Sequence, residues 1–363
     1  MKQFLKQEYV LLISFITVVL FKSYGDSVIQ SDLLSAHGLL FTAVLFVVAM
    51  AAIFAVVRHS DALAIKLGDP YGTLILTLSV ILLEVVMISS VMLTGDANPV
   101  LARDTMFAVI MTVLNGLVGI TLLIGGMKYH TQKYNIDGLK SYLVAIVPLA
   151  MLCLVLPNFT SSSDSGIMSQ SLTITLVMAS LVLYSVFLFL QTKSHTHFFM
   201  DDDHQDEHDY HGPLNSNVFH SILLVSYLTV VILMAKSLAI PIDQTIVTVG
   251  APPALGGLVV AVLILAPEAV GAAKAALNNQ LQRAMNLFFG SVLATIALTV
   301  PAVLLIANMI QEPILLGLEP AEMILLVTTL LMTAVSFSSG RTHSLNGAAH
   351  LILFIAYIIL MFE

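Results

Sequence analysis

Long runs of apolar residues alternate with short polar segments along most of the chain. A helix needs roughly 20 mainly apolar residues to cross about 30 Å of hydrocarbon, so these runs predict membrane-spanning helices. Eleven runs can be marked out, and the fifth and tenth are short. They cover residues 9–22, 38–57, 72–93, 104–126, 141–156, 167–191, 218–239, 254–276, 284–310, 322–337 and 346–362. The pattern predicts an all-α polytopic membrane protein with about 11 transmembrane helices.

The composition agrees with a protein that lies mostly in lipid. Hydrophobic residues make up 58% of the chain and charged residues 10%, whereas soluble proteins have about 25% charged residues. The net charge of −8 is local, because residues 201–209 hold six carboxylates and leave 16 acids against 14 bases elsewhere. We therefore expect no binding to nucleic acid. The single cysteine, Cys153, lies in an apolar run and can form no intrachain disulfide.

The first apolar run has the length of a signal peptide and follows Lys2 and Lys6. No small-x-small cleavage site comes after Val10–Phe21, so we expect a retained first helix.

Lysine and arginine are distributed unevenly between the two sides that these helices define. With the N-terminus in the cytoplasm, eleven lie on the cytoplasmic side and three on the other, which fixes the orientation by the positive-inside rule and places the C-terminus outside. The eleven are Lys2, Lys6, Arg58, Lys66, Lys128, Lys133, Lys140, Lys193, Lys274, Arg283 and Arg341. The three are Lys22, Arg103 and Lys236.

Rare polar residues recur within the apolar runs at a fixed spacing. Shifting the sequence by 184 residues superposes Gly72 on Gly256 and Glu84 on Glu268. Each glutamate lies 12 residues after its glycine. Such internal repetition indicates that the chain contains two related halves.

A second match follows in the next predicted helix. There a shift of 180 residues superposes Arg103 on Arg283 and Asn115 on Thr295, and the longer turn around residues 94–99 absorbs the difference. Helices two to six then correspond to helices seven to eleven. Because five is odd, the second copy enters the membrane from the other side, as in many secondary transporters. Chance similarity between apolar segments is the alternative.

These matches predict four regions. They are an N-terminal transmembrane helix and loop (1–35), a first five-helix repeat (36–192), a cytoplasmic linker (193–216) and a second five-helix repeat (217–363). The linker is too polar to form a core. It is either a solvated connection or a sensor of divalent metal, although no EF-hand spacing is present. Its histidines are His195, His197, His204, His208 and His211, and its acids are Asp201, Asp202, Asp203, Asp206, Glu207 and Asp209.

Glu84 and Glu268 are the acidic residues that fall well inside predicted spans. Insertion scales give a cost of about 2.5–3.5 kcal/mol for a charged residue at a helix centre, so two such carboxylates indicate function. Desolvation favours the protonated carboxyl, whereas a bound cation favours the ionised form. A proton and a cation therefore compete for the same group, which is the physical basis of antiport. The alternative is that each glutamate stays protonated and only bonds a neighbouring helix.

Proline and glycine predict breaks in the helices that carry these glutamates. Pro267 has no amide hydrogen, so the carbonyl of Leu263 loses its helical partner beside Glu268. Gly72 and Gly256 are the other predicted helix-breaking positions. Freed carbonyls are suitable ligands for hard cations.

Four polar residues complete the predicted binding site for cation and proton. They are Asn115, Asn279, Ser291 and Thr295. Thr299 continues the stripe of Ser291 and Thr295, but hydroxyls in membrane helices often bond their own backbone, so we expect it to be structural.

Three motifs resemble the calcium/cation exchanger superfamily, specifically its bacterial calcium/proton and sodium/proton antiporter branch. They are GTLILTLSVILLEV at 72–85, PEAVGAAKAALNNQ at 267–280 and RAMNLFFGSVLATIALTVP at 283–301. The resemblance covers nearly the whole chain. It implies a transporter of the bacterial inner membrane in which Glu84 and Glu268 alternately bind cation and proton, with Asn115 and Ser291 lining the site.

The chain also departs from the superfamily pattern, which usually has Gly-Asn three to four residues before each glutamate. Here the corresponding pairs are Val80-Ile81 and Ile264-Leu265, and the first Gly-Ser pair is replaced by Ile110-Met111. Both calcium and sodium therefore stay candidates as the transported ion.

These observations predict a secondary transporter that exchanges cytoplasmic calcium, sodium or both, and potassium as a further candidate, for protons. A passive cation channel that uses the same carboxylates is the alternative. An intramembrane hydrolase is disfavoured because no catalytic set is recognisable, and His350, near the start of the last helix, is expected to be a packed polar residue. The expected partners are inorganic cations, protons and lipid, and we expect no cofactor. The sequence does not decide between a monomer and a homo-oligomer.

Overall fold

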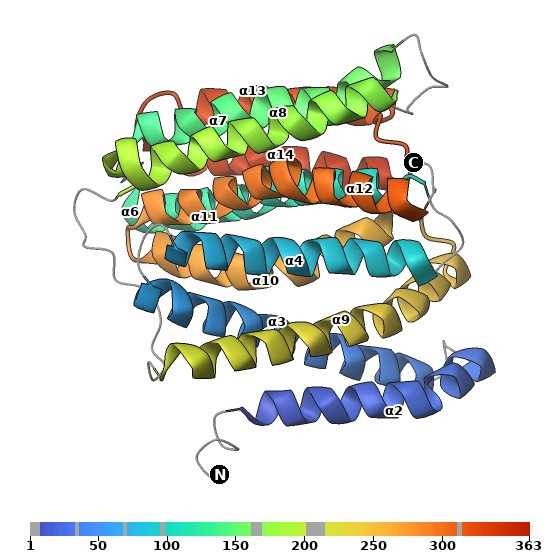
Figure 1. Ribbon diagram of the computed structural model, residues 1–363. Helices are drawn as coiled ribbons and strands as arrows, with labels where there is room; N and C mark the ends of the chain where they lie inside the picture. Colours follow the sequence, from blue (N-terminus) through green and yellow to red (C-terminus); the bar gives the residue numbers. More distant parts are fainter. Residues whose placement is uncertain are drawn as a thin grey trace. The chain divides into compact units, whose positions relative to one another are not determined.

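The computed structural model describes residues 8–32, 36–67, 71–94, 99–160, 169–200, 215–310 and 314–363. Helices make up most of these ranges (Figure 1), which confirms the all-α class. Among the described residues, eight helices are long and apolar enough to cross a membrane, and three further apolar helices are shorter. The prediction of a multi-pass membrane protein is therefore confirmed.

Several helices run well beyond the apolar runs that predict them. The helix α3 covers Ala36–Leu67, where the sequence predicts 38–57, and α9 covers Asn217–Thr248, where it predicts 218–239. Hydropathy marks the part of a helix that matches the hydrocarbon, whereas backbone hydrogen bonding continues into the polar ends. The predicted spans were therefore shorter than the helices that contain them.

The chain divides into two compact units, of which the first comprises residues 1–98 and 208–256. Its helices are α2 (Tyr9–Asp32), α3, α4 (Tyr71–Thr94) and α9. Within this unit α3 packs against each of the other three. Leu45, Ile53, Tyr227 and Met234 are fully buried in its core.

The second unit comprises residues 99–207 and 257–363. Its helices are α5 (Leu101–Met111), α6 (Val118–Tyr129), α7 (Ile136–Ala150), α8 (Gln170–Phe189), α10 (Ala254–Leu277, which begins at the boundary), α11 (Leu281–Ala294), α12 (Val300–Ile310), α13 (Pro320–Ser336) and α14 (Ser344–Met361). Four π-helical segments continue α5, α7, α8 and α11: η1 (Thr112–Leu117), η2 (Met151–Val155), η4 (Leu190–Ser194) and η6 (Thr295–Thr299). Two 3₁₀ turns are η3 (Leu156–Phe159) and η5 (Thr196–Phe198).

Loops at one end of the second unit are tied together by a short antiparallel pair of strands. The strand β1 (Gln132–Lys133) follows α6, and β2 (Arg341–Thr342) follows α13. The end of α10 lies at the same place and contacts the end of α6. The carbonyl of Leu277 accepts hydrogen bonds from Lys128 and Tyr129 at 2.6 and 2.7 Å. Three connections far apart in sequence therefore lie at the same end.

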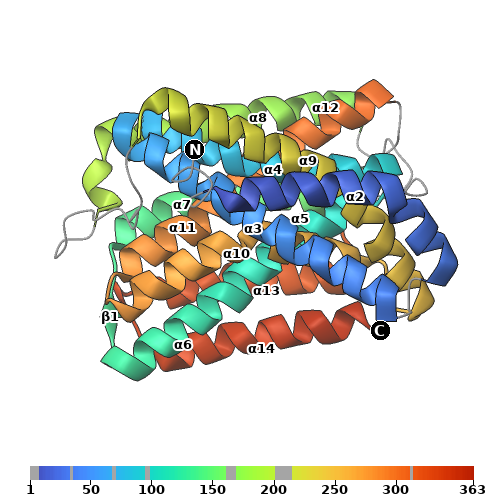
Figure 2. The ribbon, with the colours of Figure 1, turned by 90° about the horizontal axis from the view of Figure 1, so that it is seen from below.

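Glycines allow α6 and α14 to approach closely in the second unit, and Figure 2 shows the two helices side by side. A Cβ atom added at Gly347 would lie 2.6 Å from the backbone nitrogen of Leu123 and 2.7 Å from the carbonyl oxygen of Gly119. Backbone atoms cannot move aside as a flexible side chain can. Close approach through small residues is a common way to pack helices in a membrane.

Replacing Gly347 with alanine should therefore push α14 away from α6. We expect a loss of about 1–3 kcal/mol in stability, the usual cost of overpacking, measured as a lower melting temperature of the purified protein in detergent. Gly271→Ala is the matched control, because its new Cβ would lie 3.6 Å from Leu287, an ordinary contact. Equal melting temperatures for the two variants would contradict this account of the α6–α14 packing.

Candidate functional site

Glu84 lies in the middle of α4, in the first unit. The residue is 2% exposed. Its neighbours Leu83, Met87 and Ile88 are buried apolar side chains, exposed by 1–2%. The sequence predicts a carboxyl group inside an apolar span, and the structure places Glu84 in such an environment.

Glu268 lies in α10, in the second unit, and is half-buried. It follows Pro267 directly, and α10 continues through this proline from Ala254 to Leu277. Because proline lacks an amide hydrogen, the carbonyl of the fully buried Leu263 has no donor four residues later. The carbonyl therefore lacks the usual α-helical donor.

The two predicted helix-breaking glycines mark helix starts. Gly72 is the second residue of α4 and Gly256 is the third residue of α10. The glutamate in each helix therefore follows its glycine by 12 residues of continuous helix.

Asn115 and Thr295, which the sequence comparison pairs, both lie in π-helical segments. Asn115 belongs to η1 and Thr295 is the first residue of η6, and both are buried. Segments of this kind widen the helix by one residue and often occur at functional sites. Ser291 lies one turn before Thr295 in α11 and is half-buried.

The side chain of Asn115 is held by two other helices of the second unit. Its Nδ2 donates to the hydroxyl of Thr329 at 2.7 Å, and its Oδ1 lies 3.2 Å from Nδ1 of His350. His350 is fully buried. The packed polar residue that the sequence predicts at this position is therefore a partner of a predicted site residue.

Asn279 differs from the other predicted site residues in its exposure and in its backbone conformation. It is exposed in the turn between α10 and α11, with φ of 61°. Its Oδ1 accepts a hydrogen bond from Nε2 of Gln132 at 3.2 Å. Asparagine tolerates this left-handed backbone better than most residues, which gives Asn279 a clear role in the turn.

The described residues contain no group of three or more histidine, cysteine, aspartate or glutamate side chains arranged to hold a metal. The linker residues 201–214 lie outside the described residues, so the metal-sensor hypothesis for the linker stays a prediction. A cation bound within the described ranges would be held mainly by oxygen atoms of carboxyl, hydroxyl, amide and carbonyl groups, which suit hard cations.

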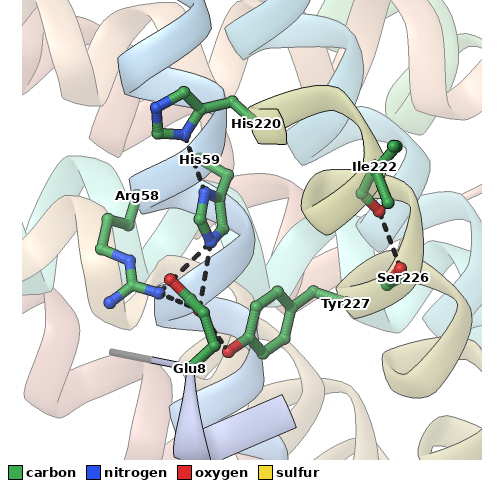
Figure 3. A network of polar contacts seen from close by, with 7 residues as sticks. All are labelled: Glu8, Arg58, His59, His220, Ile222, Ser226 and Tyr227. Atoms are coloured by element: carbon green, nitrogen blue, oxygen red, sulfur yellow. Dashed lines mark hydrogen bonds and ion pairs between the residues drawn. The ribbon is translucent and has the colours of Figure 1, made fainter. Parts of the chain in front are cut away.

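Sequence reasoning missed a buried polar network in the first unit, shown in Figure 3. Glu8 is 6% exposed at the start of α2, and its Oε2 accepts hydrogen bonds from Tyr227 at 2.8 Å and from Arg58 at 2.6 Å. His59 lies 3.4 Å from the same oxygen. The other ring nitrogen of His59 lies 3.0 Å from Nδ1 of His220. The only sequence signal was polar residues near the ends of three predicted spans.

The network favours the ionised form of Glu8. Burial opposes the charge, but hydrogen bonds from His59 and Tyr227 and the charge of Arg58 outweigh it and hold the pKa of Glu8 below its usual value. The Arg58 side chain is 40% exposed, so water screens part of its contribution. The network thereby ties the start of α2 to α3 and α9.

The fold and the carboxyl groups within its apolar helices together indicate a class of protein, the multi-pass cation transporters. The structure resembles two solved exchangers that are under 25% identical in sequence and therefore compare in fold alone. YfkE has a TM-score of 0.74 at 18% identity, over 97% of this chain and 99% of that chain. The H⁺/Ca²⁺ exchanger CAX has a TM-score of 0.67 at 12% identity, over 98% of this chain and 88% of that chain.

Sequence comparison then identifies the family. The model of the sodium/calcium exchanger protein family matches residues 37–193 and 219–363. The sodium-potassium/proton antiporter ChaA of Escherichia coli (strain K12) is 48% identical over 318 residues, 86% of each chain. The chain therefore belongs to the sodium/calcium exchanger family, which confirms the resemblance seen in its motifs.

Glu8→Gln should weaken the network in a pH-dependent way. A lowered pKa means that the ionised carboxylate stabilises the fold above the ordinary value of 4.5, and that this contribution is lost as the pH falls through the folded-state pKa. At pH 7 we expect a loss of about 2 kcal/mol, typical of hydrogen bonds to a charged group. The difference from the unmodified protein should persist down to about pH 5 and shrink in stronger acid.

Thermal unfolding in detergent at a series of pH values measures this difference. Glu363→Gln is the control, because Glu363 is exposed at the end of the chain. A stability gap that is the same at pH 7 and in strong acid would show that ionised Glu8 is not the stabilising species.

Proposed function

We propose that this protein is a secondary active transporter that exchanges cytoplasmic cations for protons by alternating access, with Glu84 and Glu268 as the groups that bind both. The observation that carries the proposal is the matched placement of these residues. The helices α4 and α10 are each 24 residues long, and Glu84 and Glu268 are their fourteenth and fifteenth residues. Carboxyl groups within membrane spans are rare and mark ion pathways and proton relays.

Helix lengths and irregularities support two repeats of five helices after a first helix. The helices α3 and α9 each have 32 residues, directly before α4 and α10. In the next span of each half a π-helical segment interrupts the helix, η1 in one and η6 in the other. We propose that all eleven apolar helices cross the membrane and that the two repeats have opposite orientations.

Competition between proton and cation supplies the mechanism. When a glutamate releases its proton, the carboxylate can bind a cation, and when the cation leaves, desolvation favours protonation again. Ser291, Thr295 and Asn115 would add oxygen ligands, together with the carbonyl of Leu263. Because each site holds either species, inward proton flow can drive cation export. A passive channel is not favoured, since the similar proteins named above are antiporters and exchangers.

Sodium is the first candidate for the exported cation, followed by potassium and calcium. The relative with 48% identity is a sodium-potassium/proton antiporter, whereas the structural neighbour CAX is an H⁺/Ca²⁺ exchanger. The absence of Asn amides just before either glutamate removes oxygen ligands that calcium, with six to eight ligands, would need.

We also propose an orientation in the bacterial inner membrane, with the N-terminus and the linker in the cytoplasm. The connection from α6 to α7, which holds Lys133 and has Lys128 and Lys140 on its flanking helices, pairs through β1 with the loop that holds Arg341. Both loops are cytoplasmic in the orientation that the positive-inside rule favours. The strand pair therefore supports a topology in which these two loops lie on the same side.

Glu268→Gln should abolish exchange, and Glu84→Gln should do the same. Glutamine neither carries a proton to the site nor offers a negative charge to a cation, so we expect exchange to fall at least about tenfold. Everted vesicles with an acid interior, given sodium, potassium or calcium in parallel, report exchange as release of the internal protons. Glu363→Gln, at an exposed position, should match the unmodified protein.

Exchange at the normal rate by Glu268→Gln would rule out the proposed mechanism. Cation flux that dissipates its gradient with no proton movement would favour the channel.

Cation affinity should rise with pH. Because a proton must leave before the cation binds, the apparent KM should fall by up to about tenfold per pH unit for each proton released, over the range in which the site is protonated. Initial rates at several cation concentrations and pH values measure this dependence. An apparent KM independent of pH between 6 and about 9 would contradict direct competition.

A further inference from the structure

The polar side chains around Asn115 form a continuous chain of hydrogen bonds within the second unit. The chain runs from Ser336 to His350, then to Asn115, Thr329 and Met111. All five residues are at most 3% exposed. They come from α5, η1, α13 and α14. We call this set of five residues the Asn115 chain. Of its members, only Asn115 belongs to the site that the sequence predicts.

The chemistry of its last member fixes the orientation of the Asn115 amide, whose Nδ2 also lies 3.6 Å from the sulfur of Met111. The thioether sulfur of Met111 can only accept, so the hydroxyl of Thr329 donates to it at 3.5 Å. The oxygen of Thr329 then accepts from Nδ2 of Asn115 at 2.7 Å. The Asn115 amide is thereby oriented with its oxygen toward His350.

His350 completes the chain of hydrogen bonds through both of its ring nitrogens. An amide oxygen only accepts, so Nδ1 of His350 carries the hydrogen and donates to Oδ1 of Asn115 at 3.2 Å. Nε2 lies 3.1 Å from the hydroxyl oxygen of Ser336, within hydrogen-bond distance. Both ring nitrogens are used, and the ring lies between α13 and the π-helical segment η1.

We propose that His350 is a positioning residue that holds the oxygen of Asn115 ready for the transported cation. This inference rests on the proposed function, in which Asn115 is a ligand. A carbonyl oxygen has two lone pairs, so Oδ1 can accept from His350 and still bind a cation. An outer partner that fixes a ligand in this way is common at metal sites, and its loss usually costs 10–100-fold in affinity.

A proton relay through His350 is the competing explanation, and the chain of bonds disfavours it. A relay must pass a proton onward, but an amide such as that of Asn115 neither takes up nor releases protons near neutral pH. A proton that reaches His350 from Ser336 therefore has no next carrier along this chain. To position the Asn115 amide, His350 needs only the hydrogen-bond donor on its Nδ1.

The geometry of the ring gives a matched pair of variants. The Nδ2 atom of asparagine lies about where Nδ1 of histidine lies, so His350→Asn can keep the donor to Asn115. The Nε2 atom of glutamine corresponds to Nε2 of histidine, so His350→Gln can keep the contact with Ser336 but not the donor. Both variants lose the ring and its packing against Phe337, and therefore control for each other.

The test measures the KM and kcat of sodium/proton exchange in proteoliposomes, with melting temperatures as a check on folding. We expect His350→Gln to raise the KM for sodium about tenfold or more at nearly unchanged kcat, and His350→Asn to stay within about threefold of the unmodified protein. The double variant Asn115→Ala/His350→Gln should be no worse than Asn115→Ala alone, because His350 acts through Asn115.

Three outcomes would overturn the proposal. They are a normal KM for His350→Gln, equal defects in the Gln and Asn variants, or additive defects in the double variant. A fall in kcat with a shifted pH profile in both variants would instead support the proton relay. The proposed function is judged separately by Glu84→Gln and Glu268→Gln: if those variants still exchange cations, that function fails whatever the His350 variants do.

Discussion

Hydrocarbon offers no hydrogen-bond partner, so every polar group within a membrane span must find its partner inside the protein. Helices satisfy the backbone, and the described chain is helical nearly throughout. Polar side chains need a separate solution. The Asn115 chain is one such solution in the second unit, and the network around Glu8, between α2, α3 and α9, is another in the first unit. The same constraint applies to the carboxyl groups of Glu84 and Glu268, which lie within apolar helices.

The same constraint applies to the irregular backbone at several candidate residues. Pro267 removes one intrahelical bond beside Glu268, and η1 and η6 replace α-helical bonding around Asn115 and Thr295. Within a membrane such departures are costly, because a carbonyl left outside the helical pattern needs another partner. A cation that sheds its water needs oxygen atoms, and backbone irregularity supplies them where a regular helix cannot.

The sequence was sufficient for the class of fold and for the positions of its spans, because lipid imposes long apolar runs whatever the tertiary packing. Helix ends were less predictable: α3 reaches Leu67 because helical bonding does not stop where hydropathy does. Contacts between distant residues could not be predicted. Asn115 and His350 are 235 residues apart, and Glu8 and Tyr227 are 219 apart, so their meeting depends on which helix faces pack. The turn at Asn279 could not be predicted either, because its left-handed backbone leaves no mark in the pattern of apolar residues.

The choice of ion follows from how many oxygens the site can offer and how many charges it must balance. One carboxylate balances the charge of a sodium ion, whereas a calcium ion needs a second negative charge. Apolar residues at Val80-Ile81 and Ile264-Leu265 reduce the number of oxygens near both glutamates. A singly charged ion loses less on leaving water than calcium does, and so needs fewer of them. In a site with few ligands, each oxygen contributes a larger share of the binding free energy. The orientation of the Asn115 amide, and hence the donor on His350, therefore matters more than it would in a calcium site with a full set of ligands.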